Sequence, residues 1–330
     1  MDALPALGTS IMEVLMPTFN SYQPLLKANA VAIRSVHCKT YNYGSHTRQK
    51  LDIHQPASPR LINNRQAVLV FAYGGGLVQG ARTLPVPMFE KLVHANVGAF
   101  FALDHGYTVV VVDYRLLSHQ AKFPSGGEDI ALAVKWLCDN PEQVSSSHKA
   151  IDLFVMANSA GGIHLSTFLL HPSFASTREI VLKGEAVRLR GAILLGVPFD
   201  FATDSDDARE QTLMDYFGDL VSNSPLGLLK SASKTSGSSD LDFVTAGVRL
   251  LVLTAVLDPE SEILAPNDRF IHEWTQLKGP KSRTALATDV LIGHNHISPI
   301  MALGTGVERE EAWGVGVAAF CDGLRKFAPT

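Results

Sequence analysis

Cysteines and charged residues are both scarce in this sequence. Cys38, Cys138 and Cys321 are its only cysteines in 330 residues. Their odd number and wide spacing argue against a disulfide framework or a zinc site. Charged residues make up 18% of the chain, the net charge is −4, and no cluster of lysine or arginine is present. We therefore expect a reduced protein that does not bind nucleic acid.

Long hydrophobic runs are missing as well. The longest apolar stretch, 97–112, is interrupted by Asp104 and His105, and it is shorter than the roughly 20 residues of a membrane span. No basic segment followed by an apolar run opens the chain, so we expect no secretory signal and a cytoplasmic location. Apolar residues nevertheless make up 46% of the chain, which is enough for a large buried core.

Strand-like and helix-like patterns alternate along the chain, which predicts a single α/β domain over residues 1–330. Continuous Val, Ile and Leu runs are typical of strands buried on both faces of a parallel sheet. The expected strands are Val36–Tyr43, Leu51–His54, Ala67–Tyr73, Thr108–Asp113, Asp152–Ala157, Leu189–Val197, Arg249–Val256 and Thr284–Ile292. The expected helices are Asp129–Leu137, Ile163–Leu170, Asn267–Leu277 and Trp313–Phe327.

Two segments interrupt this alternation. Residues 1–35 mix Pro5, Pro17 and Pro24 with apolar residues, which predicts short helices lying over another part of the protein. Residues 201–247 separate two core strands by far more than a usual connection. We expect the second segment to be a lid or cap helix with a mobile loop.

The sharpest local motif runs from Ala157 to Gly162, with the sequence Ala-Asn-Ser-Ala-Gly-Gly. It lies between an expected strand and an expected helix, which is the setting of a nucleophile elbow. Small residues two positions before and after Ser159 suit such a strained turn. Alternatively, Ser159 is an ordinary helix N-cap.

Three glycines, Gly74 to Gly76, follow Tyr73 at the end of another strand. Without side chains, their backbone N–H groups can point into a shared space, as an oxyanion hole requires. A flexible turn is the alternative, and a phosphate loop fits poorly because no Lys-Ser/Thr pair stands in register.

A nucleophilic serine needs a base and a carboxylate that orients it, in the chain order Ser, Asp/Glu, His. Asp258 follows an expected strand and is the predicted acid, with Glu260 and Glu262 as competitors and Glu262 better suited to support. His294 and His296 follow the last strand. We favour His296 as the base; His294 then supports the loop, and a metal site at the pair lacks a recognisable third ligand.

Together these residues resemble the α/β-hydrolase superfamily, and within it the hormone-sensitive-lipase-like carboxylesterases and the kynurenine-formamidase-like group. The resemblance covers roughly residues 50–325 and rests on Tyr73–Gly76, Asp113-Tyr114-Arg115, Phe123-Pro124, Asp129, Trp136, Ser159, Asp258-Pro259 and His296. It implies an eight-stranded, mostly parallel sheet flanked by helices, with a small cap formed by residues 1–35 and about 201–247. It also implies Ser159, Asp258 and His296 as the catalytic triad, and the N–H groups of Gly75, Gly76 and Ala160 as the oxyanion hole.

The chain departs from the family pattern at three places. Tyr73 replaces the usual histidine before the glycines, Ala157 replaces the first elbow glycine, and the ending Gly293-His294-Asn295-His296 is closer to the formamidase-like group. Tyr73, Gly74 and Asn158 are candidate pocket or support residues.

The sequence predicts a serine carboxylesterase acting on small to medium esters, with no cofactor or metal. The alternatives are an amide or formamide hydrolase of the N-formylkynurenine type, a ligand receptor and an acyltransferase. A homodimer stays open.

Overall fold

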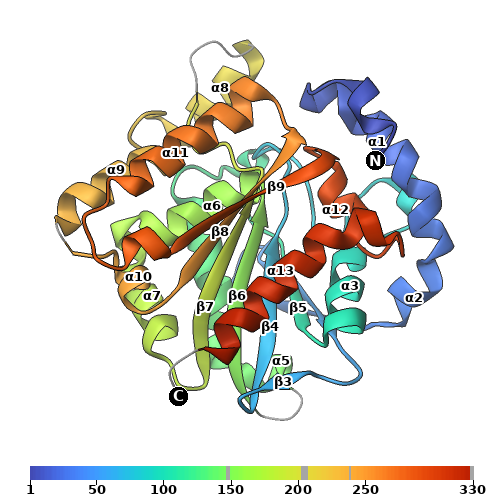
Figure 1. Ribbon diagram of the computed structural model, residues 1–330, viewed down its shortest axis with the longest axis horizontal. Coiled ribbons are helices and arrows are strands. Elements are labelled where there is room, and N and C mark those ends of the chain that lie inside the picture. The colour runs from blue at the N-terminus through green and yellow to red at the C-terminus, as the bar shows by residue number, and fades with distance from the viewer. Residues whose placement is uncertain (146–148, 202–206, 238, 328–330) are drawn as a thin grey trace.

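One mostly parallel sheet organises the part of the chain that the computed structural model describes, which is residues 1–145, 149–201, 207–237 and 239–327 (Figure 1). Its strand order is β1-β2-β5-β4-β6-β7-β8-β9, and the short β3 pairs with β4. The strands are β1 His37–Asn42, β2 Lys50–Gln55, β3 Leu61–Ile62, β4 Arg65–Ala72, β5 Thr108–Val112, β6 Ala150–Asn158, β7 Val187–Leu195, β8 Arg249–Leu257 and β9 Leu286–Asn295. The eight expected strands are confirmed, and β3 is an addition because two residues are too short for a recognisable pattern.

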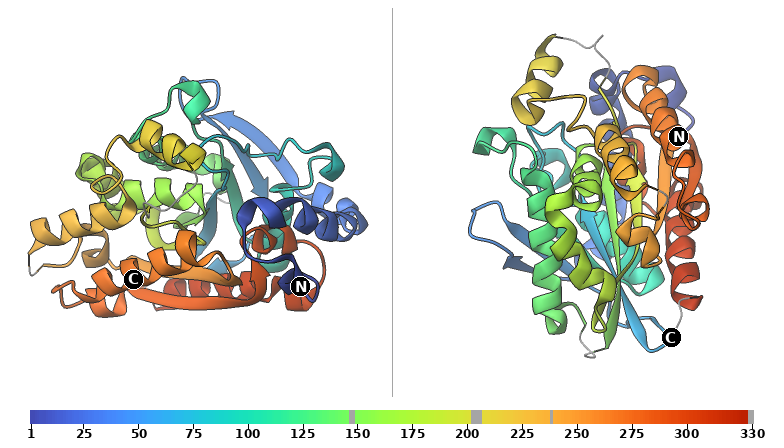
Figure 2. Two further views of the ribbon diagram at one scale, coloured as in Figure 1. Left: turned by 90° about the horizontal axis from the view of Figure 1, so that it is seen from above. Right: turned by 90° about the vertical axis from the view of Figure 1, so that its left-hand side faces the viewer.

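Strands β5, β4, β6, β7, β8 and β9 run parallel to one another, while β2 is antiparallel to both β1 and β5 at one edge. Parallel strands need crossover connections, which here are mostly helical. Helices therefore lie on both sides of the sheet (Figure 2). They are α1 Ile11–Ala28, α2 Ala30–Ser35, α3 Ala95–His105, α4 Ser125–Asp139, α5 Pro141–Val144, α6 Ala160–Leu170, α7 Ala175–Lys183, α8 Asp207–Phe217, α9 Pro225–Ser236, α10 Asp242–Thr245, α11 Ala265–Thr275, α12 Ser298–Ala302 and α13 Glu308–Lys326.

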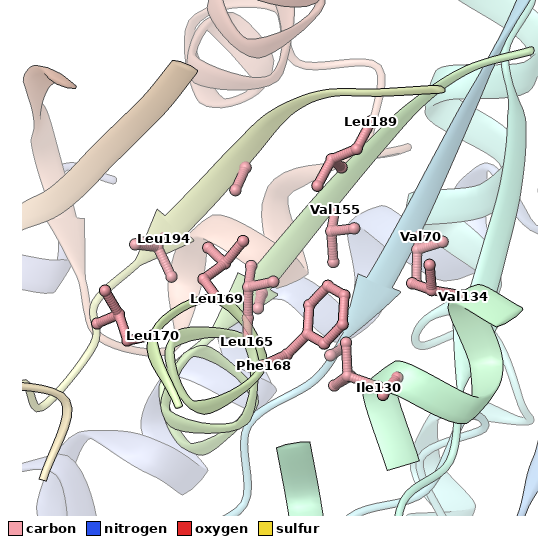
Figure 3. Packing of buried hydrophobic residues seen from close by; sticks show 14 of the residues in the cluster. Val70, Ile130, Val134, Val155, Leu165, Phe168, Leu169, Leu170, Leu189 and Leu194 are labelled. Atoms are coloured by element: carbon pink, nitrogen blue, oxygen red, sulfur yellow. The ribbon is translucent and has the colours of Figure 1, made fainter. Parts of the chain in front are cut away.

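Alternate strand residues feed two separate cores. On one face, Val70 and Val155 pack with Ile130 and Val134 of α4 and with Phe168 of α6 (Figure 3). On the other face, Phe71 and Met156 pack against α3 and α13. Full burial of each such side chain contributes about 1.5–3 kcal/mol, so the two cores hold the strand ends, and any site built on them, in place.

The N-terminal segment differs from its expectation. Sequence predicts short helices in residues 1–35, but α1 is one helix of 18 residues that passes through Pro17 and Pro24. It packs through Phe19, Tyr22 and Leu26 over α3 and α12, in a third core cluster. Figure 1 shows α1 beside the edge at which the parallel strands end. The segment therefore covers that edge, as a cap element would.

The segment 201–247 forms α8, α9 and α10 in its described part, whereas residues 202–206 and 238, part of the expected mobile loop, lie outside the described residues. The serine-rich residues 231–236 are helical, since α9 continues to Ser236. Tyr216 and Phe217 of α8 are buried in the core, and Met214 is exposed. The assignment of both segments as a cap on a single domain stays a prediction.

Candidate active site

Ser159 occupies a sharp turn between β6 and α6. Its φ of +51° and ψ of −120° place it in a region that residues with side chains rarely adopt, at a cost of about 1–3 kcal/mol. The turn is held because the Ser159 N–H donates to the carbonyl of Leu195 in β7 at 2.9 Å. Strain of this kind persists only where the surroundings impose it, and here it lifts the hydroxyl clear of the strand end.

The small residues around Ser159 are required by close backbone approach. A Cβ on Gly161 would lie 2.3 Å from the carbonyl oxygen of Ala72, and one on Gly162 would lie 2.1 Å from Val197 Cγ2. A Cβ on Gly74 would lie 3.0 Å from Ser159 Cβ. The helix start, the end of β4 and the glycine loop thus meet at one point, beside the serine.

His296 and Asp258 meet Ser159 from two other strand ends. The His296 Nε2 atom lies 3.0 Å from Ser159 Oγ, and its Nδ1 atom lies 2.7 Å from Asp258 Oδ1. The second carboxylate oxygen, Oδ2, accepts from the Ala255 N–H at 2.7 Å. Both Asp258 and His296 are buried. The three side chains form a continuous hydrogen-bonded row from carboxylate to hydroxyl.

The other histidine of the same loop has a different environment. His294 Nδ1 lies 2.8 Å from Ser298 Oγ, and burial lowers the pKa of His294 to about 4. Asn295, between the two histidines, accepts from the Ser298 N–H and donates to Thr18 Oγ1 of α1 at 2.8 Å. His294 and Asn295 therefore shape the loop, and His296 is the one that reaches the serine.

Gly196 belongs to the site and was missed by the sequence reasoning. Its φ is +56°, and a Cβ there would lie 3.1 Å from His296 Cε1 and 3.7 Å from Asp258 Oδ2. A methyl group there would press against the imidazole, and the positive φ also favours glycine. The one sequence signal is a glycine at the end of the expected strand Leu189–Val197.

The glycine loop lies beside the turn of Ser159. Gly75 and Gly76 have φ values of +142° and +61°, and a Cβ on Gly75 would lie 2.1 Å from the carbonyl oxygen of Gln79. Across the described residues, the N–H groups of Gly75, Gly76 and Ala160 make no hydrogen bond within the protein. These are three backbone donors available to a ligand.

Comparison with solved structures identifies this architecture. Esterase B from Lactobacillus rhamnosis superposes with a TM-score of 0.64 at 16% identity, over 99% of this chain and 97% of that one. Esterase 2 of Thermogutta terrifontis superposes with a TM-score of 0.61 at 16% identity, over 89% and 97%. The chain has the α/β-hydrolase fold that these esterases share.

Two sequence comparisons match part of the chain. The BD-FAE family model matches residues 51–177, a range that includes the glycine loop and Ser159 but ends before Asp258 and His296. Acetylcholinesterase of Electrophorus electricus is 30% identical over 138 residues, which is 41% of this chain and 21% of that one. The match thus spans about a fifth of that relative.

Tyr73 stands where the sequence resemblance leads us to expect a histidine. It anchors the glycine loop through its contacts with the core. Its hydroxyl donates to Asp113 Oδ1 at 2.7 Å and accepts from Arg48 at 2.6 Å, and its ring stacks between Tyr114 and His94. Burial, together with the charge of Asp113, raises the pKa of Tyr73 well above its usual value. The phenol is therefore a neutral structural group that faces the core.

The remaining candidate support residues have separate partners. The Asn158 side chain donates to the Leu195 carbonyl at 3.2 Å. Glu262 pairs with Arg209 of α8 at 2.8 Å, and so links the segment after Asp258 to the expected cap. Glu260 is exposed.

The described residues contain neither a metal-binding cluster nor a membrane-spanning helix. No group of three His, Cys, Asp or Glu side chains is arranged to hold a metal ion. None of the described helices has the length and apolar character to cross a membrane.

Proposed function

We propose that the protein is a serine hydrolase that cleaves small to medium carboxylic esters through an acyl-enzyme intermediate. The observation that carries the proposal is the row Asp258–His296–Ser159, with distances of 2.7 and 3.0 Å, ending at a strained turn. A serine hydroxyl is a weak nucleophile until a positioned base removes its proton. The esterases among the structural relatives support an ester as the substrate.

In the proposed reaction, Ser159 Oγ attacks the ester carbonyl carbon while His296 Nε2 accepts the hydroxyl proton. Asp258 accepts a hydrogen bond from Nδ1–H, which holds the imidazole tautomer and stabilises its positive charge. The N–H groups of Gly75, Gly76 and Ala160 donate to the oxyanion. His296 then returns the proton to the leaving alcohol, and a water molecule repeats the sequence to release the acid and restore Ser159.

The oxyanion step depends on donors that need no rearrangement. The Gly75 carbonyl accepts from the N–H groups of Val78 and Gln79 at 3.3 and 3.1 Å, which holds the glycine loop before substrate arrives. Donors arranged in advance stabilise a developing charge more than mobile ones, and removal of one typically lowers kcat by about 10²–10³. Tyr73 supports this loop through Asp113 and is assigned no proton transfer.

Hydrolysis of p-nitrophenyl acetate, butyrate and octanoate tests the proposal, in the presence of a metal chelator. We expect turnover by the wild type and a loss of several orders of magnitude in Ser159→Ala. Chain-length preference would measure the acyl pocket. A folded wild type that cleaves none of the three esters would refute ester hydrolysis, and turnover of N-formylkynurenine alone would assign a formamide hydrolase.

The choice of base has its own matched pair of variants. His296→Ala is expected to lose activity by several orders of magnitude, whereas His294→Ala, two residues away in the same loop, should retain most of it. Activity that survives in His296→Ala but not in His294→Ala would reverse the assignment.

A further inference from the structure

A cavity lies at the opposite end of the sheet from Ser159. Its volume is about 400 Å³, and its lining includes Arg65, Arg188, Arg190, Arg325 and Lys183. These residues stand near the beginnings of β4 and β7 and at the ends of α13 and α7. Since β6 spans the distance between the two ends, with about 3.3 Å per residue, the cavity lies roughly 30 Å from the candidate active site.

The positive side chains of this cavity outnumber the carboxylates that balance them. Glu185 is the acidic residue of the lining, Lys183 is paired with Glu179 at 2.6 Å, and Asp152 of β6 is buried. Asp322 forms ion pairs with two arginines, Arg325 at 3.0 Å and Arg60 at 2.8 Å. The carboxylate of Asp152 accepts hydrogen bonds from Arg65 Nε at 2.7 Å, Arg190 Nε at 2.8 Å and Arg325 Nε at 3.4 Å.

Arg188 is the residue that this arrangement leaves without a counter-ion. It stands opposite Asp152 in the pairing of β6 with β7, yet no described side chain or carbonyl accepts a hydrogen bond from it. Its Nε atom is sealed from solvent and has no partner. A buried donor without an acceptor costs about 1–3 kcal/mol, and more when the group is charged. The terminal Nη groups of Arg188 also have no described acceptor and are not sealed, so an anion in the cavity would bind there and neutralise the charge.

We propose that this cavity is a binding site for a small molecule that carries a phosphate group. All the nitrogens of Arg65 and Arg325 donate within the protein, which leaves the terminal N–H groups of Arg188 and Arg190 for a ligand. Guanidinium groups recognise phosphate through parallel pairs of N–H donors. A volume of about 400 Å³ holds a phosphorylated small molecule and lies within the usual range of ligand sites. The site is separate from the proposed ester chemistry and does not depend on it.

Calorimetric titration with inorganic pyrophosphate, at constant ionic strength, tests this site. We expect saturable binding of one ion per chain, and a rise in Kd of tenfold or more in Arg188→Gln. The control is Arg283→Gln, which removes the same charge from an exposed residue outside the cavity lining and should change Kd less than twofold. Arg188→Gln should keep wild-type ester turnover, which also shows that it is folded.

Three outcomes would overturn the proposal: no saturable binding by the wild type, an equal loss of affinity in both variants, or equally tight binding of citrate. The first removes the site, the second reduces it to diffuse charge, and the third removes the preference for phosphate. If Arg188→Gln does not fold, Arg190→Gln provides the same test, since Arg190 lines the same cavity.

Discussion

His164 is a buried, uncharged base whose removal should change how stability depends on pH. It lies in α6, five residues after Ser159, against the ring of Tyr114 and 3.4 Å from the Tyr216 hydroxyl. Gly126 packs so closely that a Cβ there would lie 1.9 Å from His164 Nδ1. The Nε2 atom has no hydrogen-bond partner in the described structure, and burial lowers the pKa of His164 to about 3.

The direction of the effect follows from which state binds the proton. In the unfolded chain His164 becomes protonated below about pH 6.5, whereas in the folded protein it stays neutral until about pH 3. Between these values the unfolded state binds more protons, so stability falls as the pH falls. Lowering the pH from 7 to about 4.5 should therefore remove about 2.5 kcal/mol of stability through His164 alone.

Urea unfolding of the wild type and of His164→Gln, each at pH 7 and at about pH 4.5, measures this contribution. Glutamine does not titrate, so the wild type should lose about 2.5 kcal/mol more than the variant on acidification. His272→Gln replaces an exposed histidine and should lose as much as the wild type. Equal losses in the wild type and His164→Gln would show that His164 is accessible to protons in the folded state, which would refute the reasoning.

Three further substitutions test the geometry of the site. Gly161→Ala should destabilise the protein by about 3 kcal/mol or more in urea unfolding, because the new methyl group meets a backbone oxygen at 2.3 Å; Gly316→Ala, which meets nothing within 4 Å, is its control. Gly196→Ala should lower kcat about tenfold with little change in KM, because the methyl group displaces the His296 imidazole by a few tenths of an ångström. Unchanged ester turnover would contradict this prediction. Tyr73→Phe should lower the free energy of unfolding by about 1–3 kcal/mol, since a buried carboxylate loses a donor; an unchanged urea midpoint would argue against the anchoring role.

Sequence reasoning succeeded where one pattern dominated locally. The valine run of β5 admits only a strand buried on both faces, and the observed strand is fully buried. Helix α3 was not predicted, because residues on every side of it are buried and no polar stripe marks its outer face. The single helix α1 was also missed, because its two prolines suggested breaks. Packing over α3 and α12 sustains it in the folded chain.

The candidate site shows the same limit at the level of single residues. Sequence order was enough to nominate Ser159 and Asp258, but two histidines two positions apart are equivalent in a sequence. The distinction comes from Ser298, which faces His294, and from the loop that turns His296 to the serine. Gly196 could not be nominated, since its role depends on the imidazole of His296, 100 residues later in the chain.

The contact between Ser159 and His296 joins residues that are 137 positions apart, so it has a consequence for how the chain acquires reactivity. Contacts of such long range close late in folding, because a large loop must be ordered first. A folding intermediate that has formed β4, β6 and α6 but not β8 and β9 would have the turn of Ser159 without Asp258 and His296 beside it. Under the proposed mechanism, such an unfinished chain would carry a serine of ordinary reactivity, and the hydroxyl would be activated only when β8 and β9 complete the sheet.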